Sequence, residues 1–337
     1  MIRRVGSIAF VALALFVLVG CQNTGFTLGA DGDRHEWYKG NLHTHTLNSD
    51  GDTSPDDVVQ WYRTRAYDFL VLSDHNTLTD VTALSALYGQ DPAFLLIPGE
   101  EVTDAFSGKP IHVNGYDVDS VVPPQGGTSV VDVIQRDVDA IRTAGGVPSL
   151  NHPNFFYAVT ADEIRQVERM RLFEIYNGHP LVNNNGSATV PGLEAAWDQI
   201  LSSGVLLYGI AVDDAHVFTK PGDMTVAGPG RGWVAVRAAR LSTDSILAAM
   251  ERGDFYASTG IELVTYAVSA AAMTIVVRSD ASRIVRVEFI GRNGVLLERV
   301  DGAKATYRFR GDEGYVRARV VGSDGARAWT QPERFAP

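Results

Sequence analysis

The sequence is poor in cysteine, in long hydrophobic runs and in positive charge. Its 337 residues include one cysteine, Cys21, so no intrachain disulfide framework can hold the fold. The one continuously apolar stretch, residues 8–19, is too short to anchor a stable membrane span, which excludes a protein with several spans. Lys and Arg number 29 against 40 Asp and Glu, and the resulting net charge of -11 argues against binding to duplex nucleic acid.

The N-terminal segment has the features of an export signal. Arg3 and Arg4 precede the apolar stretch, and Leu18-Val19-Gly20-Cys21 ends it. This ending resembles a bacterial lipobox, in which the cysteine is lipidated after cleavage. We therefore expect a signal peptide over 1–20, a lipid on Cys21 and a tether over 21–36. The protein would then be exported to the cell envelope, at the outer membrane or the outer face of the plasma membrane.

From residue 37 the chain alternates between short apolar runs and segments with helical periodicity. The apolar runs are typical of parallel strands buried on both faces. They cover 38–42, 69–72, 94–97, 111–116, 146–150, 172–176 and 206–212. The expected helices cover 54–65, 77–88, 129–143, 160–170, 191–202 and 243–252. Alternating strands and helices predict an α/β barrel or an open parallel sheet.

The C-terminal part has a different pattern, which predicts a small all-β domain. Strand-like runs joined by turns replace the strand–helix alternation. These runs cover 262–268, 273–278, 284–290, 295–299, 306–310 and 315–321. Asn293-Gly294 between two of them is a hairpin signal. We place the domain boundary at 260/261, with an α/β domain over 37–260 and a β-sandwich over 261–337.

Histidines and carboxylates gather at the ends of the expected strands. Seven of the eight histidines lie there, and in an α/β barrel the carboxyl ends of the strands meet at one mouth. Imidazole and carboxylate ligands together suit Zn²⁺, Mn²⁺ or Fe²⁺. Two histidines at i and i+2, such as His43 and His45, point to the same side of a strand. The sequence therefore predicts a site for divalent metal ions.

Several of these segments, taken in order, resemble the PHP (polymerase and histidinol phosphatase) superfamily. They are Leu42-His43-Thr44-His45-Thr46, Ser49-Asp50-Gly51, Leu72-Ser73-Asp74-His75-Asn76, Pro98-Gly99-Glu100-Glu101, His112, Asn151-His152-Pro153 and Asp214-Ala215-His216. Glu174-Ile175-Tyr176-Asn177-Gly178 and Phe255-Tyr256-Ala257-Ser258-Thr259-Gly260 look like the CehA/McbA branch within it. The resemblance implies a distorted (β/α)7 barrel, here followed by an Ig-like β-sandwich.

The resemblance also implies two or three divalent ions and their ligands. The ligands of the three expected sites are His43, His45, Glu100 and Asp214; Asp50, His75 and His216; and Glu100, His112 and His152. Glu100 would bridge the first and third sites. Asp50 stands where several members have His, which gives weight to Mn²⁺ or Fe²⁺ at the second site.

Other residues near these motifs have expected supporting roles. Asp214 and His216 would assist proton transfer. Asp74, Glu101 and Asp213 adjoin expected ligands and would orient them. Glu174 and His179 would orient ligands or face the substrate, and Arg231 would contact a phosphate oxygen.

These expectations are consistent with three hypotheses about the function. The first is a metal-dependent phosphoesterase that attacks a small-molecule ester through a metal-bridging hydroxide. The second is a hydrolase of aryl carbamates or carboxyl esters, of the CehA/McbA type. The third is a metal-binding envelope lipoprotein without catalytic activity.

Overall fold

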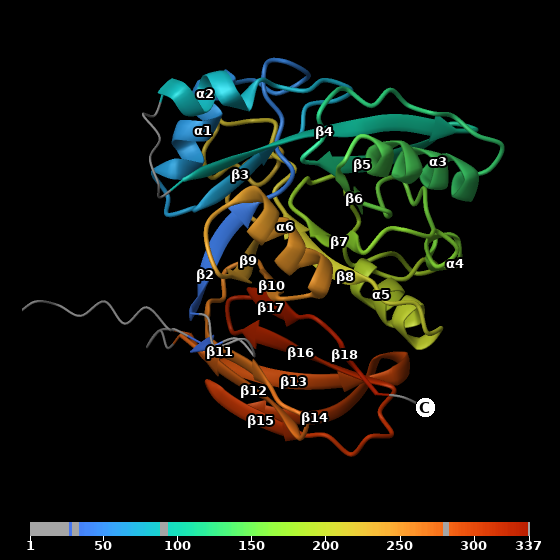
Figure 1. The fold of residues 1–337 in the computed structure, drawn as a ribbon. Helices are drawn as coiled ribbons and strands as arrows, with labels where there is room; N and C mark the ends of the chain where they lie inside the picture. The colour runs from blue at the N-terminus through green and yellow to red at the C-terminus, as the bar shows by residue number, and fades with distance from the viewer. Residues whose placement is uncertain (1–26, 29–33, 88–93, 279–282, 336–337) are drawn as a thin grey trace, which may run out of the picture.

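The computed structural model describes residues 27–28, 34–87, 94–278 and 283–335 (Figure 1). The expected signal peptide, Cys21 and most of the expected tether lie outside these residues. The tether's last residues belong to a strand, because β2 (Arg34–Asn41) begins at Arg34 and pairs with β1 (Thr27–Leu28). Within the described part of the chain, no helix has the length and apolarity needed to cross a membrane.

The seven expected apolar runs all form strands of one large sheet. In chain order they are β2, β3 (Phe69–Leu72), β4 (Leu95–Phe106), β5 (Lys109–Tyr116), β6 (Val147–Leu150), β7 (Leu172–Asn177) and β8 (Tyr208–Val212). The pairs β2–β3, β3–β4, β6–β7 and β7–β8 are parallel. The expectation of parallel strands throughout is wrong at β5, which runs antiparallel to both β4 and β6.

A tight turn explains the direction of β5. Phe106 pairs with Lys109, so Ser107 and Gly108 alone connect β4 to β5. Both have positive φ, 52° and 81°, as a two-residue hairpin turn requires. A connection this short can join only antiparallel strands, since parallel neighbours need a long crossover.

Two further strands continue the sheet beyond β2. The strand β9 (Trp233–Ala238), which the sequence did not reveal, pairs antiparallel with β2, and β10 (Phe255–Ser258) pairs antiparallel with β9.

The segment after β8, the last strand of the sheet, returns to the segment after β2. The His45 N–H donates to the Ala215 carbonyl at 2.9 Å, and the Asp214 N–H donates to the His43 carbonyl at 3.0 Å. The loops after the first and last strands of the β2–β8 series therefore meet at one rim.

The helices begin close to where the capping residues predict. They are α1 (Pro55–Arg63), α2 (Val81–Leu87), α3 (Val130–Thr143), α4 (Ala161–Ile164), α5 (Leu193–Ser202) and α6 (Thr243–Arg252). Ser54 caps α1 with Pro55 at its first position, and Thr160 and Glu163 form a capping box on α4. The helix α4 is shorter than expected, because after Ile164 the chain continues as turns whose N–H groups bond three residues back.

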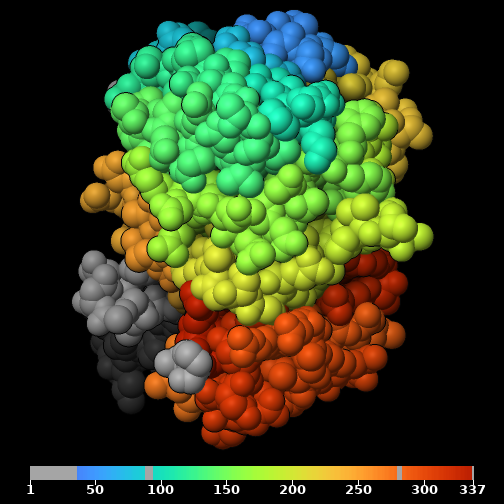
Figure 2. Space-filling view, turned by 90° about the vertical axis from the view of Figure 1, so that its right-hand side faces the viewer, coloured from blue at the N-terminus to red at the C-terminus, as the bar shows by residue number. Residues whose placement is uncertain are grey.

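The C-terminal strands form the lower part of the molecule, beneath the α/β part (Figures 1 and 2). They are β11 (Leu263–Val268), β12 (Ala272–Val277), β13 (Val285–Gly291), β14 (Val295–Asp301), β15 (Lys304–Arg308), β16 (Tyr315–Gly322), β17 (Arg327–Thr330) and β18 (Glu333–Arg334). The expected hairpin between β13 and β14 is confirmed, with Asn293 and Gly294 at φ 62° and 71°. The last two strands were not expected.

Two sheets enclose the C-terminal core. The strands β11, β12 and β15 make a three-stranded sheet, while β14, β13, β16 and β17 join the large sheet where β17 pairs with β10. Met273 and Phe289, one from each sheet, are fully buried in one apolar cluster. The whole is a mixed α/β fold built on a large, partly parallel sheet.

Candidate metal centre

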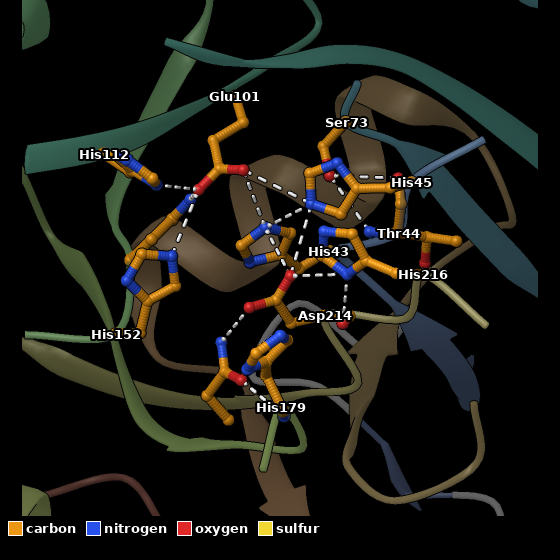
Figure 3. A network of polar contacts seen from close by, with 12 residues as sticks. His43, Thr44, His45, Ser73, Glu101, His112, His152, His179, Asp214 and His216 are labelled. Carbon is orange, nitrogen blue, oxygen red and sulfur yellow. Dashed lines mark hydrogen bonds and ion pairs between the residues drawn. The ribbon is translucent and has the colours of Figure 1, made fainter. Parts of the chain in front are cut away.

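Histidine and carboxylate side chains on the strands, or on the segments that follow them, converge at the rim where β2 and β8 meet (Figure 3). His43 and His45 follow β2, and both are fully buried. Asp214 follows β8 with a φ of 50°, a left-handed conformation that is unusual for a residue other than glycine. Strained backbone of this kind is concentrated at functional sites.

Two imidazole nitrogens and two carboxylate oxygens lie close together at the centre of the cluster. His43 Nε2 lies 3.1 Å from His45 Nε2, and each of these nitrogens is 3.2 Å from Asp214 Oδ1. Glu101 Oε2 lies 3.2 Å from His43 Nε2 and 3.3 Å from His45 Nε2. Each of the two imidazole nitrogens thus lies 3.1 to 3.3 Å from the other nitrogen and from both carboxylate oxygens.

These five spacings are of the size found between ligands of one metal ion. With ligands about 2.0–2.1 Å from Zn²⁺, the ligand atoms of a tetrahedron stand about 3.3–3.4 Å apart. The observed spacings of 3.1 to 3.3 Å are close to that value. Glu101 Oε2 is also buried without a hydrogen-bond donor, although a buried carboxylate oxygen needs a partner. A cation among these atoms would satisfy it.

The acidic residue at the centre is Glu101, where the sequence analysis placed Glu100. Neighbouring residues on a strand point to opposite faces, so only one of the two can face the histidines. The Glu100 side chain turns away and accepts a hydrogen bond from the Val122 N–H. Burial there raises the pKa of Glu100 to about 7. Glu101 therefore replaces Glu100 as the candidate ligand.

The second oxygen of Glu101 faces another pair of histidines. Oε1 lies 2.9 Å from His112 Nδ1 and 3.2 Å from His152 Nε2, and accepts a hydrogen bond from Asn151 Nδ2 at 2.8 Å. His112 lies on β5, and His152 follows β6. The two Glu101 oxygens thus connect the first and third predicted ligand sets, which is the bridging position assigned to Glu100.

The second predicted set lies at the outer side of the cluster. Asp50 Oδ1 is 3.3 Å from His216 Nε2, and Asp50 Oδ2 is 3.6 Å from His75 Nε2. These groups are more open to solvent, with the Asp50 side chain 57% exposed and His75 25%. His45 Nδ1 lies 3.6 Å from Asp50 on the inner side. The three predicted residues are therefore brought together.

The charges within the cluster stabilise one another. Burial alone would raise the pKa of Glu101, but the charges of His43 and His112 hold it well below its usual range. The pKa of Asp214 is likewise held low against burial, chiefly by His43 and by hydrogen bonding to His45. Both carboxylates are therefore ionised at neutral pH and available as metal ligands.

Glu174 lies behind the cluster rather than facing a substrate. Its carboxylate contacts His43 Nδ1 at 2.7 Å and accepts hydrogen bonds from the His152 N–H at 2.7 Å and from Asn177 Nδ2 at 2.8 Å. Asn177 also donates to Asp214 Oδ2 at 3.0 Å. A carboxylate on the far nitrogen of a ligating imidazole fixes its orientation. The sequence analysis assigned no role to Asn177 or Asn151, since amides carry no distinctive ligand signal.

Asp74 and Asp213 hold loops rather than imidazoles. Asp74 accepts hydrogen bonds from the Thr46 N–H at 2.8 Å and the Ser49 hydroxyl at 2.7 Å, which fixes the turn leading to Asp50. Asp213 accepts hydrogen bonds from the backbone N–H groups of Gly230, Arg231 and Gly232 at 2.8, 2.6 and 2.8 Å. The expected orienting role is thus indirect for both.

His179 and Arg231 occupy different positions relative to the cluster. The His179 ring lies beside His216, with centroids 5.5 Å apart, and its Nδ1 accepts a hydrogen bond from the Leu181 N–H at 3.2 Å. Arg231 donates to the carbonyls of Gly178 and Asp223 at 2.9 and 2.7 Å. Among the described residues, no hydrogen bond or ion pair joins its guanidinium to the cluster. The structure thus places His179 at the rim and turns Arg231 away.

An aromatic side chain borders the cluster on the His152 side. The Phe155 ring centroid lies 5.2 Å from that of His152 and 6.0 Å from that of His179. The neighbouring Phe156 ring is 4.5 Å away and 69% exposed. Phe156 and Tyr157 have positive φ, 50° and 54°, so this loop is held in an unusual conformation beside the site.

Comparisons with known proteins agree with this fold. No family model matches the chain. Over 150 residues it is 24% identical to a 5'-3' exoribonuclease of Haemophilus influenzae, a match that covers 44% of this chain and 54% of that protein. The chain thus spans about half the length of this curated relative.

Solved structures resemble the chain over a larger part of its length. A two-domain protein from Bacteroides vulgatus containing a PHP-like metal-dependent phosphoesterase matches with a TM-score of 0.51 and 15% identity, over 89% of this chain and 96% of that one. A candidate metal-dependent phosphoesterase from Bifidobacterium adolescentis matches with a TM-score of 0.40 and 14% identity, over 55% and 91%. At the first TM-score the likeness shows a shared fold.

Proposed function

We propose that this protein is a metal-dependent phosphoesterase of the PHP type that hydrolyses a small-molecule ester. The observation that carries the proposal is the Glu101 carboxylate. One of its oxygens lies 3.2 and 3.3 Å from the nitrogens of His43 and His45, and the other faces His112 and His152. A single carboxylate between two sets of imidazoles is the arrangement expected of a multinuclear centre.

The ligand assignment follows from these contacts. The first ion would be held by His43, His45, Glu101 and Asp214, the second by Asp50, His75 and His216, and the third by Glu101, His112 and His152. The mixture of nitrogen and oxygen ligands suits Zn²⁺, Mn²⁺ or Fe²⁺. When bound, such ions lower the pKa of a coordinated water and polarise the bond to be broken.

The chain's own residues would bind, orient and move protons around that chemistry. Glu174 holds the His43 ring in place through Nδ1, and Asn177 fixes the second oxygen of Asp214. His216 belongs to the exposed second set, its Nδ1 lies 3.7 Å from Asp214 Oδ1, and these two residues would assist proton transfer there. His179 lies at the rim, where its Nε2 would contact the substrate.

The remaining assignments belong to the same proposal. Residues 37–260 would form a distorted (β/α)7 barrel of CehA/McbA type, and residues 261–337 an Ig-like sandwich. A signal peptide over 1–20 and a lipid on Cys21 would anchor the protein in the cell envelope.

A second candidate function is hydrolysis of an aryl carbamate or aryl carboxyl ester. The observation in its favour is Phe155, whose ring lies against His152 and His179 with the exposed Phe156 beside it. Such a pair of rings provides an apolar surface for an aryl leaving group. The same metal ligands would serve both reactions.

One set of assays distinguishes these functions. The full chain, loaded separately with Zn²⁺ and Mn²⁺, is assayed with aryl phosphate mono- and diesters and with an aryl methylcarbamate. Asp214→Asn is the blank, and Asp162→Asn, whose side chain is 83% exposed, is the matched control. Phosphate ester turnover that the blank abolishes supports the first function, and carbamate turnover alone supports the second. A lack of turnover with either ion would contradict both and favour a metal-binding envelope lipoprotein.

A further inference from the structure

A cavity lies apart from the metal centre, between the α/β part and the C-terminal strands. Its volume is about 910 Å³, within the range of pockets that enclose small organic ligands. It is bordered by the loop after β7, helix α5, the glycine-rich loop 228–232 and strands β16 and β17. Its lining includes Tyr176, Asn184, Arg231, Arg319, Arg327 and Trp329. None of the candidate metal ligands lines it.

The lining is rich in arginine, and its carboxylates are already neutralised. Each acidic side chain of the lining forms an ion pair with an arginine. The pairs are Glu194 with Arg317 at 2.9 Å and Arg319 at 3.1 Å, Asp198 with Arg317 at 2.8 Å, and Asp324 with Arg283 at 2.7 Å. The positive charge that remains in the cavity therefore comes from the other two arginines, Arg231 and Arg327.

Neither of these arginines forms an ion pair among the described residues, although the charge of Asp223 acts on Arg231. Arg231 is oriented by two backbone carbonyls, which accept hydrogen bonds but do not compensate its charge. Arg327 on β17 is half-buried, and in the described part of the chain its guanidinium has no hydrogen bond or ion pair. Partly buried guanidinium groups are usually paired, so this pair favours an external anion.

Both arginines line the same cavity as Tyr176. Burial and the charge of Asp213 raise the pKa of the Tyr176 hydroxyl, and the charges of Arg231 and Arg327 oppose this rise. Tyr176 also stacks on Trp329, with ring centroids 6.3 Å apart at 29°. Two cations and a phenol hydroxyl thus lie next to an aromatic wall.

We propose that this cavity binds a small organic oxyanion, a phosphate monoester or a carboxylate, through Arg231, Arg327 and the Tyr176 hydroxyl. The guanidinium fork donates in parallel to two oxygens of such a group, and the aromatic wall covers the apolar part of the ligand. The chain carries a net charge of -11, which repels anions overall. An anion can bind in this cavity because the carboxylates of the lining are already paired with arginines.

The cavity is also connected to the metal centre through the backbone. The glycine-rich loop that carries Arg231 donates three N–H groups to Asp213, and Asp213 directly precedes the candidate ligand Asp214. A ligand on Arg231 therefore acts on a loop that is anchored one residue from the centre.

Calorimetric titration of the full chain with phenylphosphonate tests the proposal. This probe combines an aromatic ring with a dianion, and its carbon–phosphorus bond resists ester hydrolysis. We expect a binding event that persists in Glu101→Gln, which disables the metal centre, and that weakens at least tenfold in Arg327→Gln. Arg327→Lys, which keeps the charge, should retain part of the affinity. Arg310→Gln, whose side chain is 57% exposed, should bind like the wild type.

Three results would overturn the proposal. They are the absence of binding, equal affinity in the wild type and Arg327→Gln, and loss of all binding in Glu101→Gln, which would place the probe at the metal centre instead. Melting temperatures of the variants check that each one is folded, and Arg327→Lys serves if Arg327→Gln is not. The test does not depend on turnover, so it stands apart from the proposed enzymatic function.

Discussion

Replacing Glu101 by Gln should disrupt two metal sites at once, whereas the same change at the adjacent Glu100 should disrupt neither. The Glu101 oxygens lie 2.9 to 3.3 Å from nitrogens of His43, His45, His112 and His152. A contact with a charged partner contributes about 1.5–3 kcal/mol, which we take as a lower limit for a metal ligand. Losing one such contact at each of two sites amounts to about 3–6 kcal/mol, or roughly 10²- to 10⁴-fold in combined metal affinity.

The matched variant Glu100→Gln tests whether metal binding depends on the carboxylate at position 101 in particular. Glu100→Gln makes the same substitution one residue away, and its side-chain oxygen can still accept the hydrogen bond from the Val122 N–H. Metal content after gel filtration, measured by mass spectrometry, should fall by one or two ions per chain in Glu101→Gln and stay unchanged in Glu100→Gln. Turnover with the best substrate should fall in parallel. Equal metal contents in the two variants, or a larger loss in Glu100→Gln, would refute the assignment of Glu101.

Three further changes test the surroundings of the site and the fold. Burial raises the pKa of Asp137 to about 7, so ionisation of this carboxyl lowers folding stability as the pH rises from about 4 to 7. In urea unfolding, the free energy of unfolding of Asp137→Asn should match that of the wild type near pH 4 and exceed it above pH 7. A gain in stability that does not depend on pH would contradict this. Glu174→Gln should lower metal affinity about 10- to 100-fold by freeing the His43 ring, as competition with a colorimetric chelator would measure; unchanged affinity would remove Glu174 from the support of the site. Arg317 is fully buried against Asp198, and Arg317→Met should cost about 3–5 kcal/mol in urea unfolding because it leaves that carboxylate unpaired; a loss below about 1 kcal/mol would contradict the pairing.

Much of the fold could be predicted from local patterns. The expected runs over 69–72 and 172–176 coincide with β3 and β7 to within a residue, because continuous apolar runs have few alternatives to a buried strand. The helix over 243–252 is confirmed at both ends, since Ser242 caps its start and Gly253 ends it at φ 82°. The strand β9 was missed because it follows a glycine-rich loop and shows no alternation, and its direction depends on pairing with β2, far away in the sequence.

The composition of the site could be predicted better than its geometry. Histidine is rare enough that its repeated placement after apolar runs identified His43, His45, His75 and His152, and the structure brings all of them together. The hydrogen bonds that orient the side chains around the site were harder to predict. The direction of Arg231 depends on two backbone carbonyls, which no sequence pattern reveals.

The choice between Glu100 and Glu101 shows why the geometry of the site was harder to predict than its composition. Alternation of apolar and polar residues normally tells which face of a strand is inward, but both faces of β4 are buried around these positions. The distinguishing signal lay further along the chain, in Ser107-Gly108. If these two residues form a hairpin turn, Phe106 pairs with Lys109, and His112 then falls opposite Thr103. Thr103 shares a face with Glu101 and not with Glu100, so recognising the turn would have placed Glu101 beside His112 from the sequence alone.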